Sequence, residues 1–325
     1  MDLASLELQN ADVVCQWLRR GADANRSAAC RVGSIDRIKG PGEVVATGDL
    51  HDNAFNLMKL VELAGMHAVV DPSSGDGGPV DSPRADVRGG GSSRTPLRHL
   101  VLHEIIHSDR LLSGMDFSYR ALARVAALKA TFPEHVHVLL ANHELSQLIG
   151  ARILKDGVEA VAAFNQAVEY TFGDRADEVS DAIKDFIRSM PLALRCVGPK
   201  GDVLCAHSLP PPAMMARFDP TVLSRDLTPQ DYESRRGSAH VMVWGRGYDA
   251  ELLEDLVERW GVAMFILGHE KAEGGVAFVP PNAVVLNTDT AQGRYLIFSL
   301  DNPPRADQAV RLTKSLIDNE LQDQS

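Results

Sequence analysis

The sequence predicts an α/β fold because strand-like apolar runs alternate along it with amphipathic helical stretches. The first unit has a strand at residues 43–47, a helix at 54–65 and a short second strand at 67–70. This strand–helix–strand order is typical of the start of an α/β domain. Polar residues directly follow several of the apolar runs, and ligands of open α/β sheets bind at the carboxyl ends of the strands.

Length and composition limit the classes of protein that the chain can form. Its 325 residues suffice for one large domain or two ordinary ones, and 45% are hydrophobic and 24% charged, as in globular proteins. We find no apolar run long enough for a membrane span and no secretory signal at the N-terminus, so we expect a cytoplasmic protein without membrane contact. The formal net charge of −11 argues against non-specific binding of nucleic acid, which depends on Lys and Arg.

Further elements follow from periodicity and from helix-stop residues. We expect a helix at 10–20 that ends at Gly21, and a second helix at 119–131. Gly157 to Met190 is typical of two helices, and we interpret 151–190 as a helical insertion or cap within a single domain spanning residues 1–325. The remaining expected elements are strands at 100–102, 136–140, 193–197, 203–206, 241–243, 263–267, 283–286 and 295–300, and helices at 250–260 and 306–321.

Residues 71–96 interrupt the alternation of predicted strands and helices. They are rich in Gly, Ser, Pro, Asp and Arg and poor in large apolar residues. Such a segment cannot bury enough surface to offset the entropy lost on ordering, so we expect a flexible surface insertion.

The four cysteines form no CxxC pair and have no zinc-ligand spacing. We therefore expect free, mostly buried thiols in a reducing compartment. They are Cys15, Cys30, Cys196 and Cys205.

Polar residues that can bind metals follow five of the apolar strands. Taken singly, each is ordinary: an Asp or Asn after a strand often caps a helix, and a lone buried His is usually a core residue. All five occur at strand ends, however, and such ends can converge although they lie far apart in sequence. The residues are Asp49 with His51, then Glu104, Asn142 with His143, His207 and His269.

This series resembles the calcineurin-like metallophosphoesterase superfamily, most closely its serine/threonine phosphoprotein phosphatase branch and the bacterial relatives of that branch. The Gly-Asp-x-His motif corresponds to Gly48–His51, and the Gly-Asn-His-Glu motif corresponds to Ala141–Glu144. A strand followed by His207 and the pair Gly268–His269 match the two later motifs. The resemblance implies a four-layer αββα sandwich of two mixed sheets flanked by helices.

The resemblance also implies a dinuclear metal site and hydrolysis of a phosphomonoester by a hydroxide held on it. Asp49 and His51 would hold the first ion, and Glu104 would bridge to the second. The ligands of the second ion would be Asn142, His207 and His269. These donors suit two divalent ions, with manganese our first expectation and iron or zinc the alternatives.

Catalytic and substrate-binding roles follow by the same resemblance. His143 would protonate the leaving group, and Asp109 would orient His143, although His107 competes with Asp109 for that role. Arg110 and Arg246 are candidates for binding the phosphate, because a guanidinium matches its geometry.

The chain departs from the motifs at several places. Glu104 stands where the family has aspartate, so its carboxylate reaches one methylene further, and His103 replaces a glycine. Asp109 and Arg110 follow Glu104 at a spacing about two residues longer than in the family, and Asp52 replaces the glycine that commonly follows the first histidine.

Three interpretations of function remain open. The first is a phosphatase acting on a phosphorylated small molecule, a nucleotide or a phosphoprotein. The second is a catalytically impaired metal-binding or scaffold relative, favoured by the departures just described. The third is a nuclease or other phosphodiesterase, which the acidic charge disfavours, as does the absence of a second histidine two residues after His269, where Lys271 stands.

Overall fold

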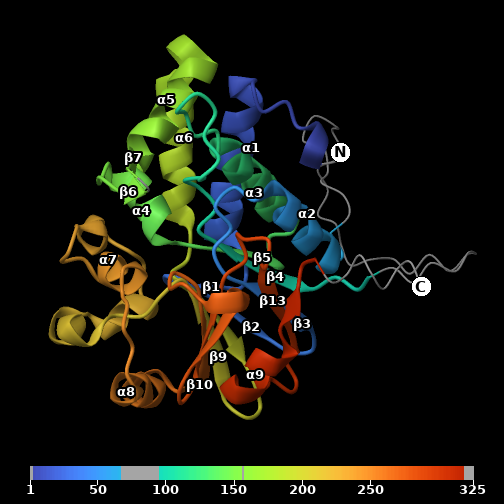
Figure 1. Cartoon of the computed structure of the whole chain (residues 1–325), viewed down its shortest axis with the longest axis vertical. Coiled ribbons are helices and arrows are strands. Elements are labelled where there is room, and N and C mark those ends of the chain that lie inside the picture. The colour runs from blue at the N-terminus through green and yellow to red at the C-terminus, as the bar shows by residue number, and fades with distance from the viewer. Residues whose placement is uncertain (1–2, 67–94, 156, 318–325) are drawn as a thin grey trace, which may run out of the picture.

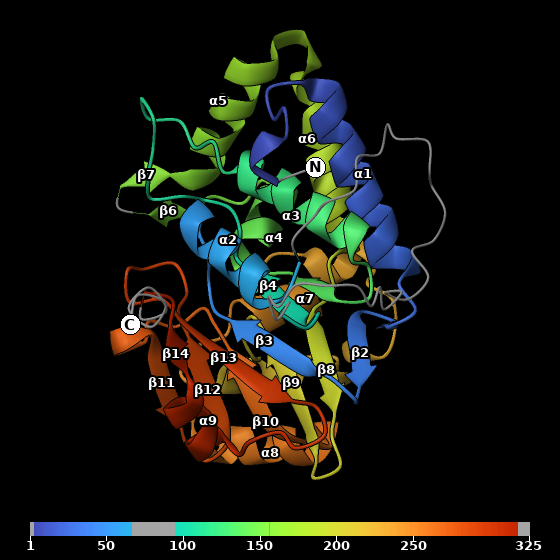
Figure 2. The same ribbon diagram turned by 90° about the vertical axis from the view of Figure 1, so that its right-hand side faces the viewer.

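The computed structural model describes residues 3–66, 95–155 and 157–317. Two mixed β-sheets lie face to face between helical layers, as Figures 1 and 2 show. The expected strand at 67–70 and most of the expected insertion at 71–96 fall outside the described residues. No helix in the described ranges has the length and apolarity needed to cross a membrane.

The larger sheet has strand order β1-β2-β8-β9-β10-β12-β11 and contains both parallel and antiparallel pairs. Its strands are β1 (Arg31–Val32), β2 (Ile35–Lys39), β8 (Ala193–Val197), β9 (Asp202–Ala206), β10 (Val262–Leu267), β12 (Ala283–Leu286) and β11 (Val276–Val279).

The smaller sheet has strand order β14-β13-β3-β4-β5, with β3, β4 and β5 parallel. Its strands are β14 (Lys314–Ser315), β13 (Arg294–Ser299), β3 (Glu43–Thr47), β4 (His99–His103) and β5 (Val136–Leu139). A separate two-stranded hairpin, β6 (Leu154–Lys155) with β7 (Val158–Glu159), precedes the two helices at 160–172 and 176–189.

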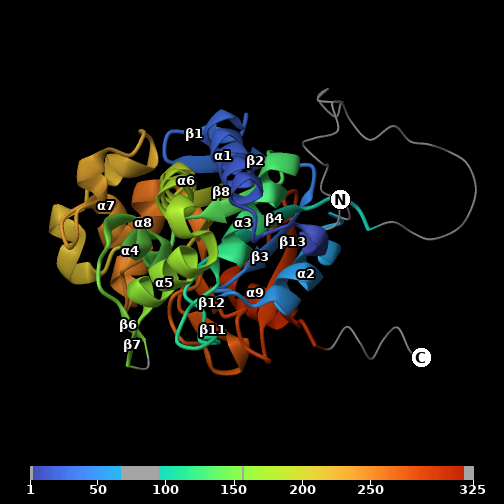
Figure 3. The same ribbon diagram turned by 90° about the horizontal axis from the view of Figure 1, so that it is seen from above.

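Helices cover the outer faces of both sheets. Seen from above in Figure 3, α7 lies at one side and α2 at the other, with α3 and the sheets between them. The helices are α1 (Ala11–Ser27), α2 (Ala54–Leu63), α3 (Tyr119–Thr131), α4 (Asn142–Ile149), α5 (Ala160–Phe172), α6 (Ala176–Ser189), α7 (Ser238–Val243), α8 (Ala250–Trp260) and α9 (Ala306–Leu312). The expected four-layer sandwich is therefore confirmed.

Alternation along the strands builds the core between the sheets. Val44 and Ala46 of β3 belong to one buried cluster with Cys205 of β9 and Ile266 of β10. Val45, on the opposite face of β3, belongs to the larger cluster. Successive side chains of a strand point to opposite faces, so β3 contributes to both sides of its sheet.

The expectation that Gly21 ends the first helix is wrong. Helix α1 continues to Ser27, and Gly21 is buried against α3. A Cβ at this position would lie 2.8 Å from the backbone oxygen of Ala126. The glycine therefore permits close packing of two helices, a role that local sequence does not distinguish from a helix stop.

Two other expected elements differ from the structure. The expected strand at 241–243 is the end of helix α7, because a short apolar run buried on all sides suits either element. The expected helix at 306–321 ends at Leu312, and the chain then adds β14 to the smaller sheet. Strands β2 and β11 were not expected from the sequence.

Candidate metal centre

The polar residues that follow the strands meet at one edge of the two sheets. Asp49 follows β3, Glu104 follows β4, and Asn142 begins α4 just after β5. His207 follows β9 and His269 follows β10, so both sheets contribute. These five side chains are at most 7% exposed, and His51 lies beside them at intermediate exposure.

Glu104 lies at the middle of the group, and its two carboxylate oxygens contact different histidines. Its Oε1 is 3.0 Å from Nε2 of His51 and 3.6 Å from Nε2 of His143. Its Oε2 is 2.7 Å from Nε2 of His207. Burial alone would raise the pKa of Glu104, but the attraction of His207, His143 and His51 outweighs burial and lowers that pKa well below its usual value.

Nε2 of His207 lies close to side-chain atoms of three other residues of the group. It lies 2.6 Å from Oδ1 of Asn142 and 3.1 Å from Nδ1 of His269, in addition to its contact with Glu104. Two of these neighbours are oxygen acceptors, and a single ring nitrogen cannot donate well to both.

Asp49, which follows β3 of the smaller sheet, contacts residues from both sheets. Its carboxylate accepts the backbone N–H of His269 at 2.9 Å, and its Oδ1 lies 3.5 Å from Nδ1 of His103. Metal-capable atoms of Asp49, His103 and His207 lie within 4.8 Å of one another. Asp49 and His51, which the resemblance assigns to one ion, do not share such a group within the described residues; His51 is grouped with Glu104 and His143.

Backbone conformation at the site is unusual. Five of the seven non-glycine residues with positive φ in the described ranges lie in the site or next to it. Such conformations cost of order 1–3 kcal/mol each and cluster at functional sites. The five residues are His51, Asp52, Glu104, His107 and His269.

Gly268 permits the contact between the loop after β10 and Asp49. A Cβ here would lie 2.3 Å from both Oδ1 of Asp49 and Cε1 of His103. Only glycine therefore allows the backbone of His269 to reach the Asp49 carboxylate.

The ring of His143 has His107 as its neighbour. The two Nδ1 atoms are 2.9 Å apart, and Nε2 of His107 lies 3.1 Å from Oε1 of Gln147. Asp109 forms an ion pair with Lys155 at 2.8 Å, and its side chain is 56% exposed. The structure thus places His107, the competing candidate, beside His143.

Three cationic side chains border the site. Arg246 donates to the backbone oxygen of His269 at 2.7 Å, and Arg110 donates to the backbone oxygen of Asp52 at 2.8 Å. Both arginines are exposed. Lys155 lines a cavity of about 60 Å³ together with His107 and Asp109.

Sequence reasoning missed the contributions of His103, Gln147 and Lys155. From the sequence His103 is apparent only as a bulky replacement for glycine, although it is the last residue of β4 and directly precedes Glu104. Gln147 stands four residues after His143 and hence on the same face of α4, which is a usable signal. Nothing in the local pattern around Lys155 points to the site.

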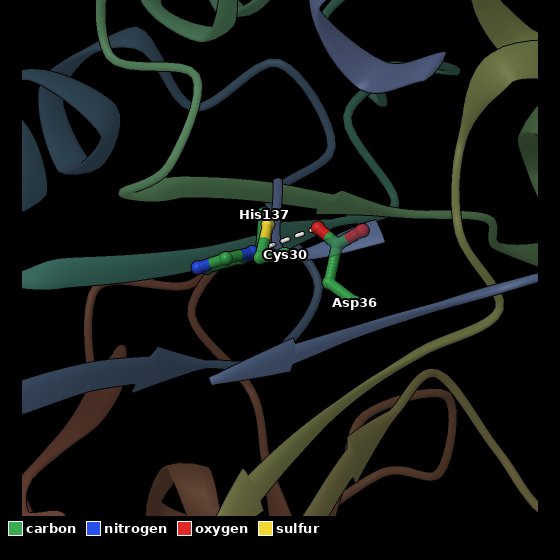
Figure 4. A group of neighbouring side chains, drawn as sticks. All are labelled: Cys30, Asp36 and His137. Carbon is green, nitrogen blue, oxygen red and sulfur yellow. Dashed lines mark hydrogen bonds and ion pairs between the residues drawn. The ribbon is translucent and has the colours of Figure 1, made fainter. Parts of the chain in front are cut away.

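A second cluster of metal-capable side chains lies outside this site. Cys30, Asp36 and His137 are buried together, as Figure 4 shows. The hydrogen bond between Nδ1 of His137 and Asp36 is 2.8 Å long. Asp36 also pairs with Arg31 at 2.8 Å. Burial raises the pKa of Asp36, but the hydrogen bond with His137 and the charge of the fully buried Lys129 outweigh burial and lower that pKa. Two cations already balance this cluster, so it is better suited to a buried hydrogen-bonded link between the sheets than to a dication.

The main site, in contrast, fits a metal. Nε2 of His269 is buried and has no hydrogen-bond partner among the described residues, and Oε2 of Glu104 has the ring nitrogen of His207 at 2.7 Å. Carboxylate, amide and imidazole groups are the donors that transition metals use. A cation bound near Glu104, Asn142 and His207 would interact with the lone pairs that these side chains direct toward one another.

The fold described above is similar to the folds of solved phosphatases. Among solved structures, the chain is similar to a protein serine/threonine phosphatase from Saccharomyces cerevisiae, itself described as similar to human phosphatase PP5. The identity is 14% and the TM-score is 0.58, over 89% of this chain and 82% of the other.

A second similar structure is a cold-active protein-tyrosine phosphatase from a psychrophilic Shewanella species. The identity is 13% and the TM-score is 0.53, over 90% of this chain and 84% of the other. No protein-family model and no curated protein matches the chain by sequence. At these identities the comparisons establish the fold.

Proposed function

We propose that the protein is a metal-dependent phosphomonoesterase with a two-ion site. The observation that carries the proposal is the position of Glu104, whose two oxygens face two different sets of candidate ligands. A buried carboxylate in this position is suited to hold two cations a few ångströms apart.

The candidate ligands divide around Glu104. His51 lies on one side, and Asn142, His207 and His269 lie on the other, with Asp49 adjoining this second set. The donor set suits manganese, and also iron or zinc. When bound, such ions supply charge stabilisation to phosphate oxygens and lower the pKa of a coordinated water.

The protein's own residues account for binding of the phosphate and for proton transfer. Arg110 and Arg246 border the site from two loops, and their guanidinium groups would hold the phosphate oxygens. Nε2 of His143 faces Glu104 and is placed to pass a proton to the leaving oxygen.

The substrate class is part of the proposal. The two similar structures are named as phosphatases of serine/threonine and of tyrosine in proteins. We therefore propose a phosphoprotein or a smaller phosphomonoester, such as a nucleotide, as substrate. The four buried free thiols favour a reducing cytoplasm as the compartment.

The test is turnover of an aryl phosphate by manganese-loaded protein, with Glu104→Gln as the variant and Glu254→Gln as the matched control. Glu254 is exposed on α8, away from the site. Glu104→Gln removes the shared negative charge, so we expect loss of at least one ion and of turnover, whereas the control keeps both.

The outcomes separate the competing functions. Retention of both ions by Glu104→Gln contradicts the two-ion assignment. Bound manganese without turnover of any phosphomonoester favours a metal-binding scaffold, and faster turnover of a bis(aryl) phosphate favours a phosphodiesterase.

A further inference from the structure

His103 lies directly behind the candidate metal ligands. It ends β4, immediately before Glu104, and is only 1% exposed. Its Nε2 is 3.0 Å from the backbone oxygen of Thr47, and its Nδ1 is 3.1 Å from Nδ1 of His207. The ring therefore joins the end of β3 to a histidine that follows β9.

These two contacts determine which nitrogen carries the proton in each ring. A backbone oxygen can only accept a hydrogen bond, so Nε2 of His103 is the protonated atom. In the neutral ring of His103 the remaining lone pair is on Nδ1, and its nearest possible donor is Nδ1 of His207, at 3.1 Å, whereas the Asp49 oxygen at 3.5 Å can only accept. The lone pair of His207 is then on Nε2, the atom that faces Glu104, Asn142 and His269.

We infer that His103 is a positioning residue, which accepts a hydrogen bond from Nδ1 of His207 and so presents Nε2 of His207 to a metal ion. This inference rests on the metal site of the proposed function. Histidine ligands commonly donate their second ring nitrogen to a neighbouring acceptor, which fixes both tautomer and ring orientation.

The alternative is that His103 is itself a ligand, together with Asp49 and His207. A neutral imidazole has one lone pair, so His207 can bind one ion only, through Nδ1 or through Nε2. Nδ1 of His207 has neighbours at 3.1 Å and 3.6 Å, in His103 and Asp49. Nε2 has three candidate ligand atoms within 3.1 Å, which favours the ion on that side.

Two amide variants of His103 separate these roles. In His103→Asn the amide oxygen replaces Nδ1 and keeps an acceptor for His207, whereas in His103→Gln the amide replaces Nε2 and keeps only the bond to Thr47. Titration of the full-length protein with Mn²⁺ should show binding weakened by about 10- to 100-fold in His103→Gln, and by less than about tenfold in His103→Asn. An equal loss in both variants overturns the inference.

A second measurement does not depend on folding of the variants. Long-range ¹⁵N–¹H correlation spectra of histidine-labelled wild-type protein report which ring nitrogen is protonated. We expect the proton of His207 on Nδ1 and that of His103 on Nε2 when Zn²⁺ is bound. Binding of Zn²⁺ through Nδ1 of His207, with the ring proton on Nε2, overturns the inference. Failure of the wild-type protein to bind Mn²⁺ or Zn²⁺ would instead contradict the proposed function, and the metal-free spectra would still show whether Nε2 of His103 carries its proton.

Discussion

At the scale of single residues, His143 is placed for proton transfer and not for holding an ion. Its Nε2 is 3.6 Å from Glu104, and its Nδ1 is engaged by His107. We expect His143→Ala to reduce turnover of an aryl phosphate by about 10² or more while the metal content is unchanged. His135→Ala, at the opposite end of β5, is the control. Parallel loss of metal and turnover would show that His143 is a ligand.

The neighbour of His143 is also testable. Because His107 contacts the ring and Asp109 pairs with Lys155 on the surface, His107→Ala should lower kcat more than Asp109→Ala. Exposed ion pairs contribute little, so we expect a small effect at residue 109. Steady-state kinetics of both variants give the comparison. A larger loss of kcat in Asp109→Ala would show that Asp109 orients His143, as the sequence predicts.

Replacing an imidazole by a carboxylate at residue 107 should change the pH dependence. Burial lowers the pKa of His143 to about 3, and a neutral His107 gives no charge to oppose that effect. In His107→Asp the new negative charge raises the pKa of His143. The descending limb of the pH–rate profile should then move to higher pH by about one unit or more. Coincident profiles would argue against coupling of the two side chains.

At the scale of secondary-structure elements, the contact of α1 with α3 depends on Gly21. Alanine at this position gains up to about 1 kcal/mol in helix propensity. Its Cβ, however, would meet backbone and side-chain atoms of Ala126 at 2.8–2.9 Å, and overpacking typically costs about 1–3 kcal/mol. We therefore expect Gly21→Ala to lower the free energy of unfolding, as measured by urea denaturation. An increase in the free energy of unfolding would mean that α1 can move away from α3 to accommodate the added methyl group.

At the scale of the whole molecule, three histidines at the start of β4 and β5 couple stability to pH. His99 stacks on His135 and on His137, with ring centroids 4.9 Å and 5.3 Å apart. Burial lowers the pKa of all three, that of His99 to about 3. Asp36, which accepts from His137, and the buried Lys129 face the same group.

The sign of this effect follows from proton binding. Below a pH of about 6.5 the unfolded chain binds protons on these histidines and the folded chain does not, so stability falls as the pH is lowered toward about 3. The loss should approach about 1.4 kcal/mol per pH unit for one such group at a pH well below 6.5. Urea denaturation of the wild type and of His99→Gln between pH 8 and pH 5 tests this, and we expect the variant to show the shallower dependence. Equal slopes would contradict it.

Much of the architecture was accessible from the sequence. Helix 119–131, helix 250–260 and strands 43–47 and 283–286 have the expected bounds. These elements show clear periodicity, and local chemistry marks some of their ends, as where Asp249 caps α8. The meeting of residues from five strand ends was also predictable, because the strands of an α/β sheet present their carboxyl ends together.

The partners within the site were decided by tertiary structure. From the sequence we expected Asp109 to orient His143, with His107 as the competing candidate, but in the structure His107 contacts His143 and Asp109 pairs with Lys155. Likewise, Gly21 became a helix–helix contact and residues 241–243 became helical because of neighbours distant in sequence. Local periodicity determines which face of an element is buried, whereas the pairing of individual side chains depends on how separate elements pack, and that packing involves residues that no local window contains.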